Sequence, residues 1–213
     1  IEKYLHSIQS IYNRLTINIM CGINGIIAKR ALSGNDMTGL LTTMNDLIIH
    51  RGPDDDGTYV SATNNCTIGM AMRRLSIIDL TSGKQPIYSE DGQIAIVFNG
   101  EIYNYRELKS ELLAKGISFK TTSDTEVILK LYEQHGTESF KKLDGMFAFS
   151  IHDKNKDRIY IARDFFGEKP LYYTSQDQQF MWASELKSIV ALLNTKPAIS
   201  PKGLNLFFRL TYV

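Results

Sequence analysis

Cys21 has the side chain and the position of a catalytic nucleophile, because it directly follows Met20. Removal of that methionine would leave Cys21 as the N-terminal residue. An α-amino group has a pKa of about 7.7 to 8.0, so near neutral pH an unprotonated fraction can accept the thiol proton. One residue would then supply both nucleophile and base. The alternative is that Cys21 is a small hydrophobic side chain buried in a strand.

Two short motifs carry arginines that could bind a carboxylate. They are His50-Arg51-Gly52-Pro53-Asp54 and Arg73-Arg74-Leu75-Ser76-Ile77-Ile78-Asp79. A guanidinium matches a carboxylate in shape and charge, so an arginine here could hold an amino-acid substrate, although most arginines are solvated surface groups. His50 adds the alternatives of a Cys–His pair or a metal site, but a single histidine at the end of a helix is more often structural.

Asn99-Gly100-Glu101-Ile102-Tyr103-Asn104 follows the apolar run 94–98. An asparagine amide and a glycine N–H directed at one point would form an oxyanion hole, with the missing side chain of Gly100 leaving room for the substrate. An Asn-Gly pair after a strand is also a common hairpin turn, and for the pair in isolation we favour the turn.

Two further segments combine charge with turn chemistry. In Thr122-Ser123-Asp124-Thr125-Glu126, Asp124 could bind a substrate ammonium, or Asp124 or Ser123 could cap the helix that follows. Segment 163–173 reads Arg-Asp-Phe-Phe-Gly-Glu-Lys-Pro-Leu-Tyr-Tyr. We interpret it as a structural, salt-bridged turn between two strands.

The composition is that of an ordinary globular protein, with 43% hydrophobic and 22% charged residues in a chain of 213. A net charge of +1 gives no basic surface for a nucleic acid or an anionic membrane. Two cysteines are too few for a disulfide framework, and no apolar run reaches the ~18 residues that span a bilayer. These features predict a soluble, cytoplasmic protein with a small polar ligand, in which Cys66 is a core residue.

Periodicity predicts an α+β fold, since strands cluster in groups with helices between the groups. The predicted helices span 36–50, a segment from Tyr105 that Asn104 caps and Gly116 ends, and a segment from Asp124 to Gly136. The predicted strands are 23–27 with an interruption at Asn24-Gly25, 59–60, 66–72, 75–78 and 94–98, followed by the antiparallel hairpin strands 146–151, 158–162, 170–174 and 179–183.

Six elements together resemble the class II glutamine amidotransferases. They are Met20-Cys21-Gly22-Ile23, His50-Arg51-Gly52-Pro53-Asp54, Arg74-Leu75-Ser76, Asn99-Gly100-Glu101-Ile102-Tyr103-Asn104, Ser123-Asp124 and Lys169-Pro170-Leu171-Tyr172-Tyr173. The resemblance covers residues 20–213. Within this class, the second and fourth elements resemble those of glutamine-hydrolysing asparagine synthetases rather than those of the enzymes that form glucosamine phosphate or phosphoribosylamine.

The resemblance implies an N-terminal-nucleophile hydrolase fold, a four-layer αββα sandwich of antiparallel sheets. It also implies roles for six residues. Cys21 would attack the side-chain amide of L-glutamine, with its own α-amino group as base. Asn99 and the Gly100 N–H would hold the oxyanion, Arg74 would bind the α-carboxylate, and Glu101 and Asp124 would bind the α-ammonium group. Ammonia would leave, and water would release glutamate from the Cys21 thioester. This domain would need no metal and no cofactor.

The resemblance further implies how the chain is organised. Residues 1–20 would be a leader that is absent from the mature protein, which we attribute to a misplaced start upstream of Met20. Residues 21–196 would form the amidotransferase domain, and residues 197–213 would begin the connection to a C-terminal synthetase domain that uses ATP and magnesium to activate aspartate. No Ser-Gly-Gly phosphate motif follows Tyr173, so the chain alone is expected to hydrolyse glutamine without making asparagine. A homodimer is compatible with the family, but the sequence does not fix the oligomeric state.

Three rival functions remain open at this point. The domain could be an inactive glutamine-binding module if the residues before Cys21 persist. It could supply ammonia to another acceptor, such as a sugar or a peptide. It could instead be a Cys–His hydrolase that uses His50 as base, in which case His50→Ala would abolish activity.

Overall fold

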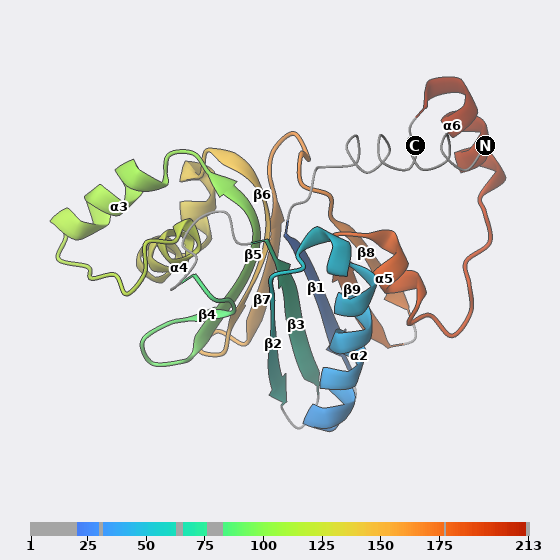
Figure 1. Cartoon of the computed structure of the whole chain (residues 1–213), viewed down its shortest axis with the longest axis horizontal. Coiled ribbons are helices and arrows are strands. Elements are labelled where there is room, and N and C mark those ends of the chain that lie inside the picture. Colours follow the sequence, from blue (N-terminus) through green and yellow to red (C-terminus); the bar gives the residue numbers. More distant parts are fainter. Residues whose placement is uncertain (1–20, 30–31, 63–65, 76–82, 177, 212–213) are drawn as a thin grey trace, which may run out of the picture.

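Two antiparallel β-sheets stacked face to face form the centre of the molecule, and helices cover both outer faces (Figure 1). The computed structural model describes residues 21–29, 32–62, 66–75, 83–176 and 178–211. The predicted leader 1–20 and most of the predicted strand 75–78 therefore lie outside the described residues. Of that strand, only Leu75 is described, and it falls just after the end of a strand.

The first sheet has the strand order β2-β3-β1-β9-β8, and every neighbouring pair in it is antiparallel. Its strands are β1 (Gly22–Ala28), β2 (Asp55–Ala62), β3 (Thr67–Arg74), β8 (Tyr172–Gln176) and β9 (Gln179–Ala183). Strand β1 is the central strand of this sheet. Cys21 directly precedes β1, so it lies at the end of the central strand rather than near an outer strand.

The second sheet has the order β4-β5-β6-β7 and is also antiparallel. Its strands are β4 (Ile87–Tyr88), β5 (Ile94–Ile102), β6 (Gly145–Asp153) and β7 (Arg158–Arg163). Strands β6 and β7, like β8 and β9, pair as the predicted hairpins.

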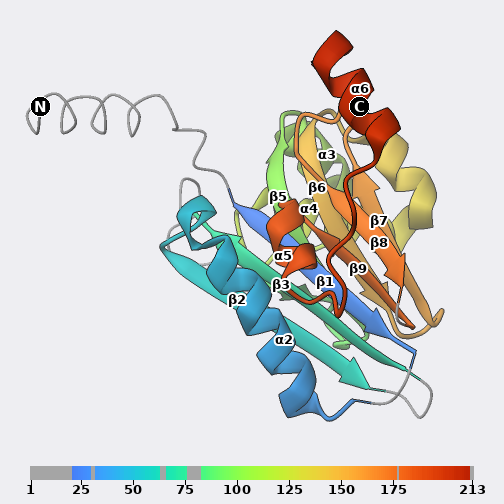
Figure 2. The same cartoon turned by 90° about the vertical axis from the view of Figure 1, so that its right-hand side faces the viewer.

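Each sheet has its own layer of helices. On the first sheet lie α2 (Gly34–Leu47) and α5 (Leu186–Val190), which Figure 2 shows in front of β1, β3 and β9. On the second sheet lie α3 (Tyr105–Ala114), α4 (Asp124–His135) and the 3-10 helix η2 (Gly136–Lys142). A short 3-10 helix η1 (Ile49–Arg51) follows α2, and α6 (Pro201–Leu210) stands apart from these layers.

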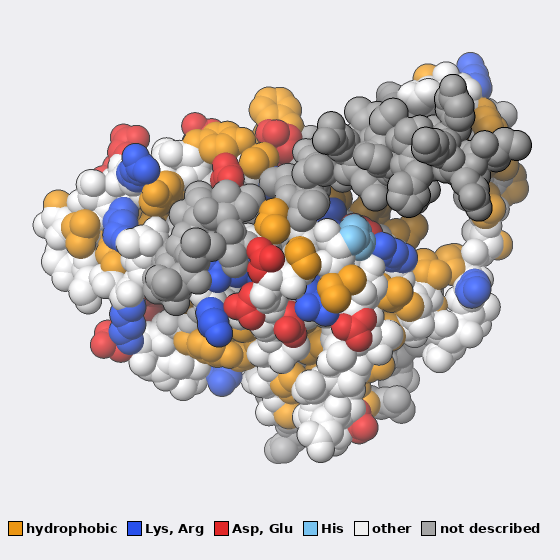
Figure 3. Space-filling view, in the orientation of Figure 1, with side chains coloured by type: hydrophobic (Ala, Val, Ile, Leu, Met, Phe, Trp, Pro, Cys, Tyr) orange, Lys and Arg blue, Asp and Glu red, His pale blue; other side chains and the backbone are white. Residues whose placement is uncertain are grey.

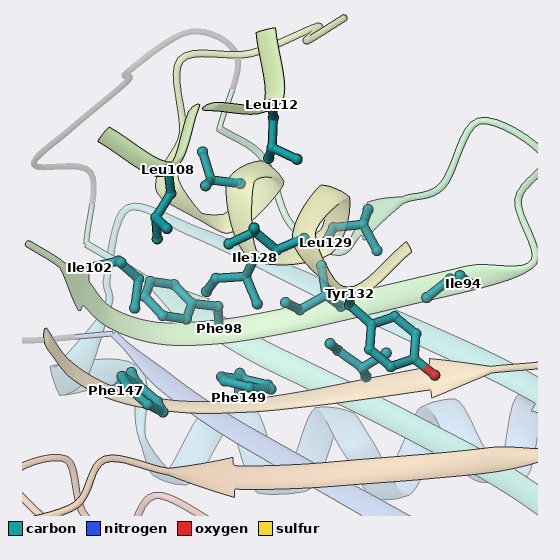
Figure 4. Close-up of a cluster of buried hydrophobic side chains, with 14 residues drawn as sticks. Ile94, Phe98, Ile102, Leu108, Leu112, Ile128, Leu129, Tyr132, Phe147 and Phe149 are labelled. Atoms are coloured by element: carbon teal, nitrogen blue, oxygen red, sulfur yellow. The ribbon is translucent and has the colours of Figure 1, made fainter. Parts of the chain in front are cut away.

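Three hydrophobic cores hold the layers together. The first joins α3 and α4 to the second sheet through residues such as Phe98, Ile128 and Phe149 (Figure 4). The second joins α2 to the first sheet through Met37 and neighbours. The third lies between the two sheets and includes the fully buried Trp182. This confirms the predicted α+β class and the αββα order of layers.

Gly25 shows why β1 carries a glycine at its centre. The predicted strand 23–27 is confirmed as part of β1, and Asn24 and Gly25 interrupt only its apolar run, where a close backbone approach was expected. A Cβ on Gly25 would instead come within 2.0 Å of the indole ring of Trp182, the residue opposite it on β9. The glycine is therefore needed to seat Trp182 between the sheets.

The helix predictions hold with small corrections. Helix α2 ends at Leu47, so His50 and Arg51 belong to the separate turn η1. Asn104 precedes α3 as expected, but its side chain does not cap that helix. It donates to the carbonyl oxygen of Lys142 and accepts from the N–H of Asp144, so it fastens α3 to the start of β6 instead.

Candidate active site

A cavity opens where the start of β1, the end of β3, the end of β5 and the start of α4 converge. All six residues singled out from the sequence line it: Cys21, Arg74, Asn99, Gly100, Glu101 and Asp124. The first two come from one sheet, the next three from the other, and Asp124 from α4. The cavity therefore lies at one end of the sandwich, where the two sheets meet.

Cys21 presents its sulfur to this cavity. The Leu75 N–H donates to Cys21 Sγ over 3.3 Å. Burial raises the pKa of the Cys21 thiol, and the Leu75 hydrogen bond and the charges of Arg74 and Arg51 only partly offset that effect. The sulfur is therefore a protonated thiol at neutral pH and needs a base before it can act as a nucleophile.

Asn99 is the most unusual polar residue of the site. It is 1% exposed, and neither its amide nitrogen nor its amide oxygen has a hydrogen-bond partner among the described residues. A buried, unpaired amide costs about 1 to 3 kcal/mol, so such a group is retained where a ligand can pair with it. Because Asn99 lines the cavity, its amide N–H groups could donate to an anion bound there.

The favoured turn at Asn99-Gly100 is wrong, since both residues lie inside β5 and pair with β6. Gly100 is required there, but not to make room for a substrate. A Cβ at this position would lie 2.1 Å from the carbonyl oxygen of Met146 on β6. The glycine therefore permits a close approach of two strands at a φ of 156°.

The three candidate arginines have three different environments. Arg73 donates to Asn45 O and forms an ion pair with Asp46, away from the cavity. Arg51 donates to the carbonyl oxygen of Cys21 at 3.1 Å. Only Arg74, which is 5% exposed, lines the cavity, so it is the one placed to bind a carboxylate there.

Glycine in the first arginine motif positions Arg74. Pro53 forms a bridge with Arg74, and the Asp54 N–H donates to the Arg74 carbonyl oxygen at 3.2 Å. A Cβ on Gly52 would lie 2.4 Å from the Arg74 nitrogen, so only glycine allows the turn to lie against the end of β3. The two arginine motifs thus form one structural unit.

Glu101 and Asp124 give the lining of the cavity two carboxyl groups. Asp124 accepts from the Ile102 N–H, while Ser123 rather than Asp124 caps α4 by accepting from the Thr125 N–H. Burial, with a smaller contribution from the charge of Glu101, raises the pKa of Asp124. A bound cation would lower it again, so this wall suits an ammonium group.

Gln85 supports the site but was missed from the sequence. Its side chain accepts from the Phe98 N–H at 2.6 Å and donates to the Phe98 carbonyl oxygen at 3.1 Å, immediately before Asn99. Gly83, Leu75 and Thr125 also line the cavity. No local pattern marks Gln85, because its role arises only when its loop lies beside β5.

The 163–173 segment is a turn between β7 and β8, as predicted, but the hydrogen bonds of Arg163 and Asp164 go to backbone groups. Asp164 accepts from the N–H groups of Phe147, Glu168 and Lys169, and Arg163 donates to the Gly167 and Lys169 carbonyl oxygens. Lys169 is 2% exposed. Burial lowers its pKa, although the charge of Glu101 acts against this.

His50 is engaged elsewhere. Its Nε2 lies 2.8 Å from Glu185 Oε1, and its side chain is 53% exposed. In the described part of the chain, no group of three His, Cys, Asp or Glu residues is placed to hold a metal ion. The geometry therefore gives His50 an ion-pair partner rather than the Cys21 thiol.

The chain belongs to the glutamine amidotransferase domain family, whose model matches residues 20–213. Asparagine synthetase [glutamine-hydrolyzing] 1 of Bacillus subtilis is 49% identical over 176 residues, which are 82% of this chain and 27% of that protein. Asparagine synthetase B of Escherichia coli is 38% identical, over 83% of this chain and 31% of its own length. Amidase chry2 of Gibberella zeae is 40% identical, over 81% of this chain and 26% of that protein. The chain thus spans about a quarter to a third of these relatives.

Solved structures support the fold. The glutamine phosphoribosylpyrophosphate amidotransferase of B. subtilis superposes with a TM-score of 0.60 at 22% identity, over 79% of this chain and 43% of that one. The allosteric regulatory enzyme of purine biosynthesis superposes with a TM-score of 0.65 at 21% identity, over the same shares. This confirms the N-terminal-nucleophile hydrolase fold expected from the sequence.

Proposed function

We propose that this chain is the glutaminase part of a glutamine-hydrolysing asparagine synthetase, with Cys21 as nucleophile. The observation that carries the proposal is the cavity that joins Cys21, Arg74, Asn99 and the two carboxyl groups, with the Asn99 amide buried and unpaired on its wall. The domain organisation that we expect is a mature N-terminus at Cys21, an amidotransferase domain to residue 196 and a connecting segment from 197 to 213.

The proposed reaction follows from the positions of these groups. The α-amino group of Cys21 takes the thiol proton, and the sulfur forms a bond with the side-chain carbonyl carbon of glutamine. The resulting oxyanion accepts hydrogen bonds from Asn99 and the Gly100 N–H. The α-amino group returns the proton to the leaving nitrogen, the C–N bond breaks and ammonia departs. Water then hydrolyses the thioester to glutamate and regenerates the thiol.

Substrate recognition would use the rest of the cavity wall. Arg74 would pair with the α-carboxylate of glutamine, while Glu101 and Asp124 would pair with its α-ammonium group. The raised pKa of Asp124 supports this assignment, because it marks a carboxyl group that gains from a cationic ligand.

The acceptor of the ammonia belongs to the remainder of the protein. We propose aspartate as acceptor, activated with ATP and magnesium in a synthetase domain; what supports asparagine as the product is the similarity to relatives named as asparagine synthetases. We place the reaction in the cytoplasm, where the Cys21 thiol would stay reduced. Among the described residues, no helix is long and apolar enough to cross a membrane.

The test is glutamate release from glutamine by protein expressed from Met20, with the start of the mature chain at Cys21 verified by intact mass. Cys21→Ala is expected to abolish release. Protein that retains residues before Cys21 is expected to be inactive as well, because the α-nitrogen of Cys21 is then part of a peptide bond and cannot act as the base. Equal activity in the Cys21→Ala variant would overturn the proposal, and loss of activity in His50→Ala with Cys21 reactivity intact would favour the Cys–His mechanism.

A second candidate is an amidotransferase with a different acceptor. The observation in its favour is the 40% identity to a relative named as an amidase. The two candidates share the glutaminase step and differ in what consumes ammonia. Asparagine formation from aspartate and ATP by the full-length protein would decide for the first, and glutamate release without asparagine would decide for the second.

A further inference from the structure

The segment that follows β9 contacts the residues around Cys21 from the side opposite β3. The Ser184 N–H donates to the Ile23 carbonyl oxygen at 2.8 Å, and the Ile23 N–H donates to Ser184 Oγ at 2.9 Å. Ser184 is fully buried. These two bonds extend the pairing of β1 and β9 to within two residues of the nucleophile.

The next residue, Glu185, reaches Cys21 through Arg51. Glu185 Oε1 accepts from Arg51 Nη1 at 3.3 Å, and Arg51 Nε donates to the Cys21 carbonyl oxygen at 3.1 Å. The side chains of Arg51 and Glu185 are 13% and 23% exposed. A Cβ on Gly22 would lie 3.1 Å from Arg51 Cδ, so the arginine stem lies against the backbone next to the nucleophile.

Glu185 carries its negative charge in this setting. Burial raises its pKa, but hydrogen bonds from Lys187 and His50, the charge of His50 and the hydrogen bond from Arg51 outweigh it, so the pKa of Glu185 lies below its ordinary value. Its contacts are Lys187 Nζ at 3.0 Å, His50 Nε2 at 2.8 Å and Arg51 Nη1 at 3.3 Å. The carboxylate therefore stays ionised through the neutral range.

A guanidinium is a rigid plane, so two bonds on different nitrogens fix its orientation. One bond goes to Glu185 and the other to the carbonyl group of Cys21. That carbonyl group is bonded to Cα of Cys21, which carries the amino group directly and the thiol through Cβ. Holding the carbonyl group therefore limits the movement of both reacting groups, and a small displacement there would shift the sulfur within the cavity.

We propose that Glu185 is a positioning residue of the glutaminase, which acts through Arg51 to hold Cys21 in place and to balance the positive charge beside it. The inference rests on the proposed function and adds a residue outside the cavity lining. Among the described residues, positive charges that act on Cys21 come from Arg51 in η1, Arg74 in β3 and Lys169 in the turn before β8. Glu185 is the carboxylate that contacts the first of these.

The test compares Glu185→Ala and Glu185→Gln with the unchanged protein, all with Cys21 at the N-terminus. Glu185→Ala removes both the hydrogen bonds and the charge, so kcat for glutamate release is expected to fall roughly tenfold while KM for glutamine stays within twofold. Glu185→Gln keeps an acceptor oxygen and is expected to recover most of kcat. Glu138→Gln, which removes an exposed carboxylate on η2, serves as the matched control.

A second readout does not need glutaminase activity. The rate at which iodoacetamide alkylates Cys21 is measured against pH by mass spectrometry, with Cys66 as reference in the same chain. Loss of the Glu185 charge leaves Arg51 unbalanced, so the Glu185→Gln profile for Cys21 is expected to move by about half a pH unit to lower pH. The Cys66 profile is expected to stay in place.

The outcomes separate the two proposals. If the protein without substitutions is alkylated normally at Cys21 but releases no glutamate, the proposed function is contradicted. The alkylation profiles of the Glu185 variants then still decide the role of Glu185. Unchanged kcat in Glu185→Ala together with superimposable alkylation profiles overturns the inference on Glu185. The inference on Glu185 is also overturned if circular dichroism shows a loss of folded protein that accounts for all the lost activity.

Discussion

The side-chain amide of Asn99 is buried without a hydrogen-bond partner among the described residues, which costs stability, and it lies on the wall of the cavity, where it can serve activity. Its replacement by alanine should therefore separate activity from stability. Asn99→Ala is expected to lower kcat by about 10²- to 10³-fold, the usual cost of one oxyanion donor, with little change in KM. The thermal midpoint should not fall, since the Asn99 side chain has no hydrogen-bond partner to lose among the described residues.

Steady-state kinetics and calorimetry check this prediction. Asn35→Ala, on the exposed surface of α2, is the control and should leave kcat unchanged. A fall in the midpoint of Asn99→Ala by several degrees with normal kcat would show that Asn99 is a structural residue.

Asp124 gives a pH-dependent prediction. Because folding raises the pKa of Asp124, the folded protein binds this proton more tightly than the unfolded chain does. The contribution of the protonated carboxyl group to the free energy of unfolding is therefore lost as pH rises through the raised pKa. Asp124→Asn is therefore expected to raise the unfolding midpoint at pH 7 to 8, with the gain vanishing as pH falls through that pKa. KM for glutamine should rise by about 10- to 100-fold, the loss of one charge-assisted hydrogen bond.

Thermal melts between pH 3 and 8 without glutamine, together with KM at pH 8, test this statement. A midpoint gain that is the same at all pH values would contradict the electrostatic reason. An unchanged KM would remove Asp124 from the substrate site.

At the scale of elements, the contact of β1 with β9 depends on Gly25. Gly25→Ala would place a Cβ within 2.0 Å of the Trp182 ring, so it is expected to destabilise the protein by about 1 to 3 kcal/mol, as overpacking of a core does. Gly39→Ala is the control, since no atom lies within 4 Å of its added Cβ. It should stabilise α2 by up to about 1 kcal/mol.

Urea denaturation of both variants gives the two free energies of unfolding. Trp182→Leu in the Gly25→Ala background should recover part of the loss, because the smaller side chain leaves room for the methyl group. Equal stability of Gly25→Ala and Gly39→Ala would contradict the packing seen around Trp182.

Elements with strong periodicity could be predicted from the sequence, and contacts between distant segments could not. Helices α3 and α4 and the strands β5 to β9 follow local patterns of apolar residues. The position of Asn99-Gly100 inside β5 did not follow, because a hairpin turn and a close strand approach both favour the same dipeptide. Glu185 and Gln85 are marked by nothing in their neighbourhoods, since each acts on a segment that only the fold brings near.

That the six candidate residues line one cavity was predictable for a different reason. Each belongs to a motif whose order and spacing resemble a known family, whereas local chemistry alone left a structural alternative for every one of them. Among the arginines, the resemblance already selects Arg74, and the structure supplies the reason, with Arg74 in the cavity and Arg51 on the Cys21 carbonyl oxygen. Neighbouring residues in a strand face opposite sides, so the choice between Arg73 and Arg74 depends on the register of β3.

At the scale of the molecule, charged side chains of both signs are interspersed on the face in Figure 3. The apolar side chains that do reach the surface include several in α6, with Phe208 76% exposed and Phe207 52% exposed. None of the described residues of α6 is buried. This helix therefore adds little to the stability of the two sheets.

Deletion of residues 197–213 is thus expected to change the free energy of unfolding by less than about 0.5 kcal/mol, the range of surface changes. Glutaminase activity should be retained, because no residue of this segment lines the cavity as described. Urea denaturation and glutamate release by the shortened protein check both points. A loss of several kcal/mol would mean that 197–213 belongs to the folded unit.

The central place of β1 also has a consequence for the timing of synthesis. Asn24 pairs with Ala183, and 183 − 24 = 159 residues separate them. A ribosome adds roughly 5–20 residues per second, so about 8–30 s pass before β9 can join β1. Throughout that interval one side of β1 has no neighbour, and the nascent chain start stays open to the aminopeptidase that would remove Met20. If synthesis starts at Met20 as proposed, the nucleophile is made early and its strand gains the β9 neighbour late.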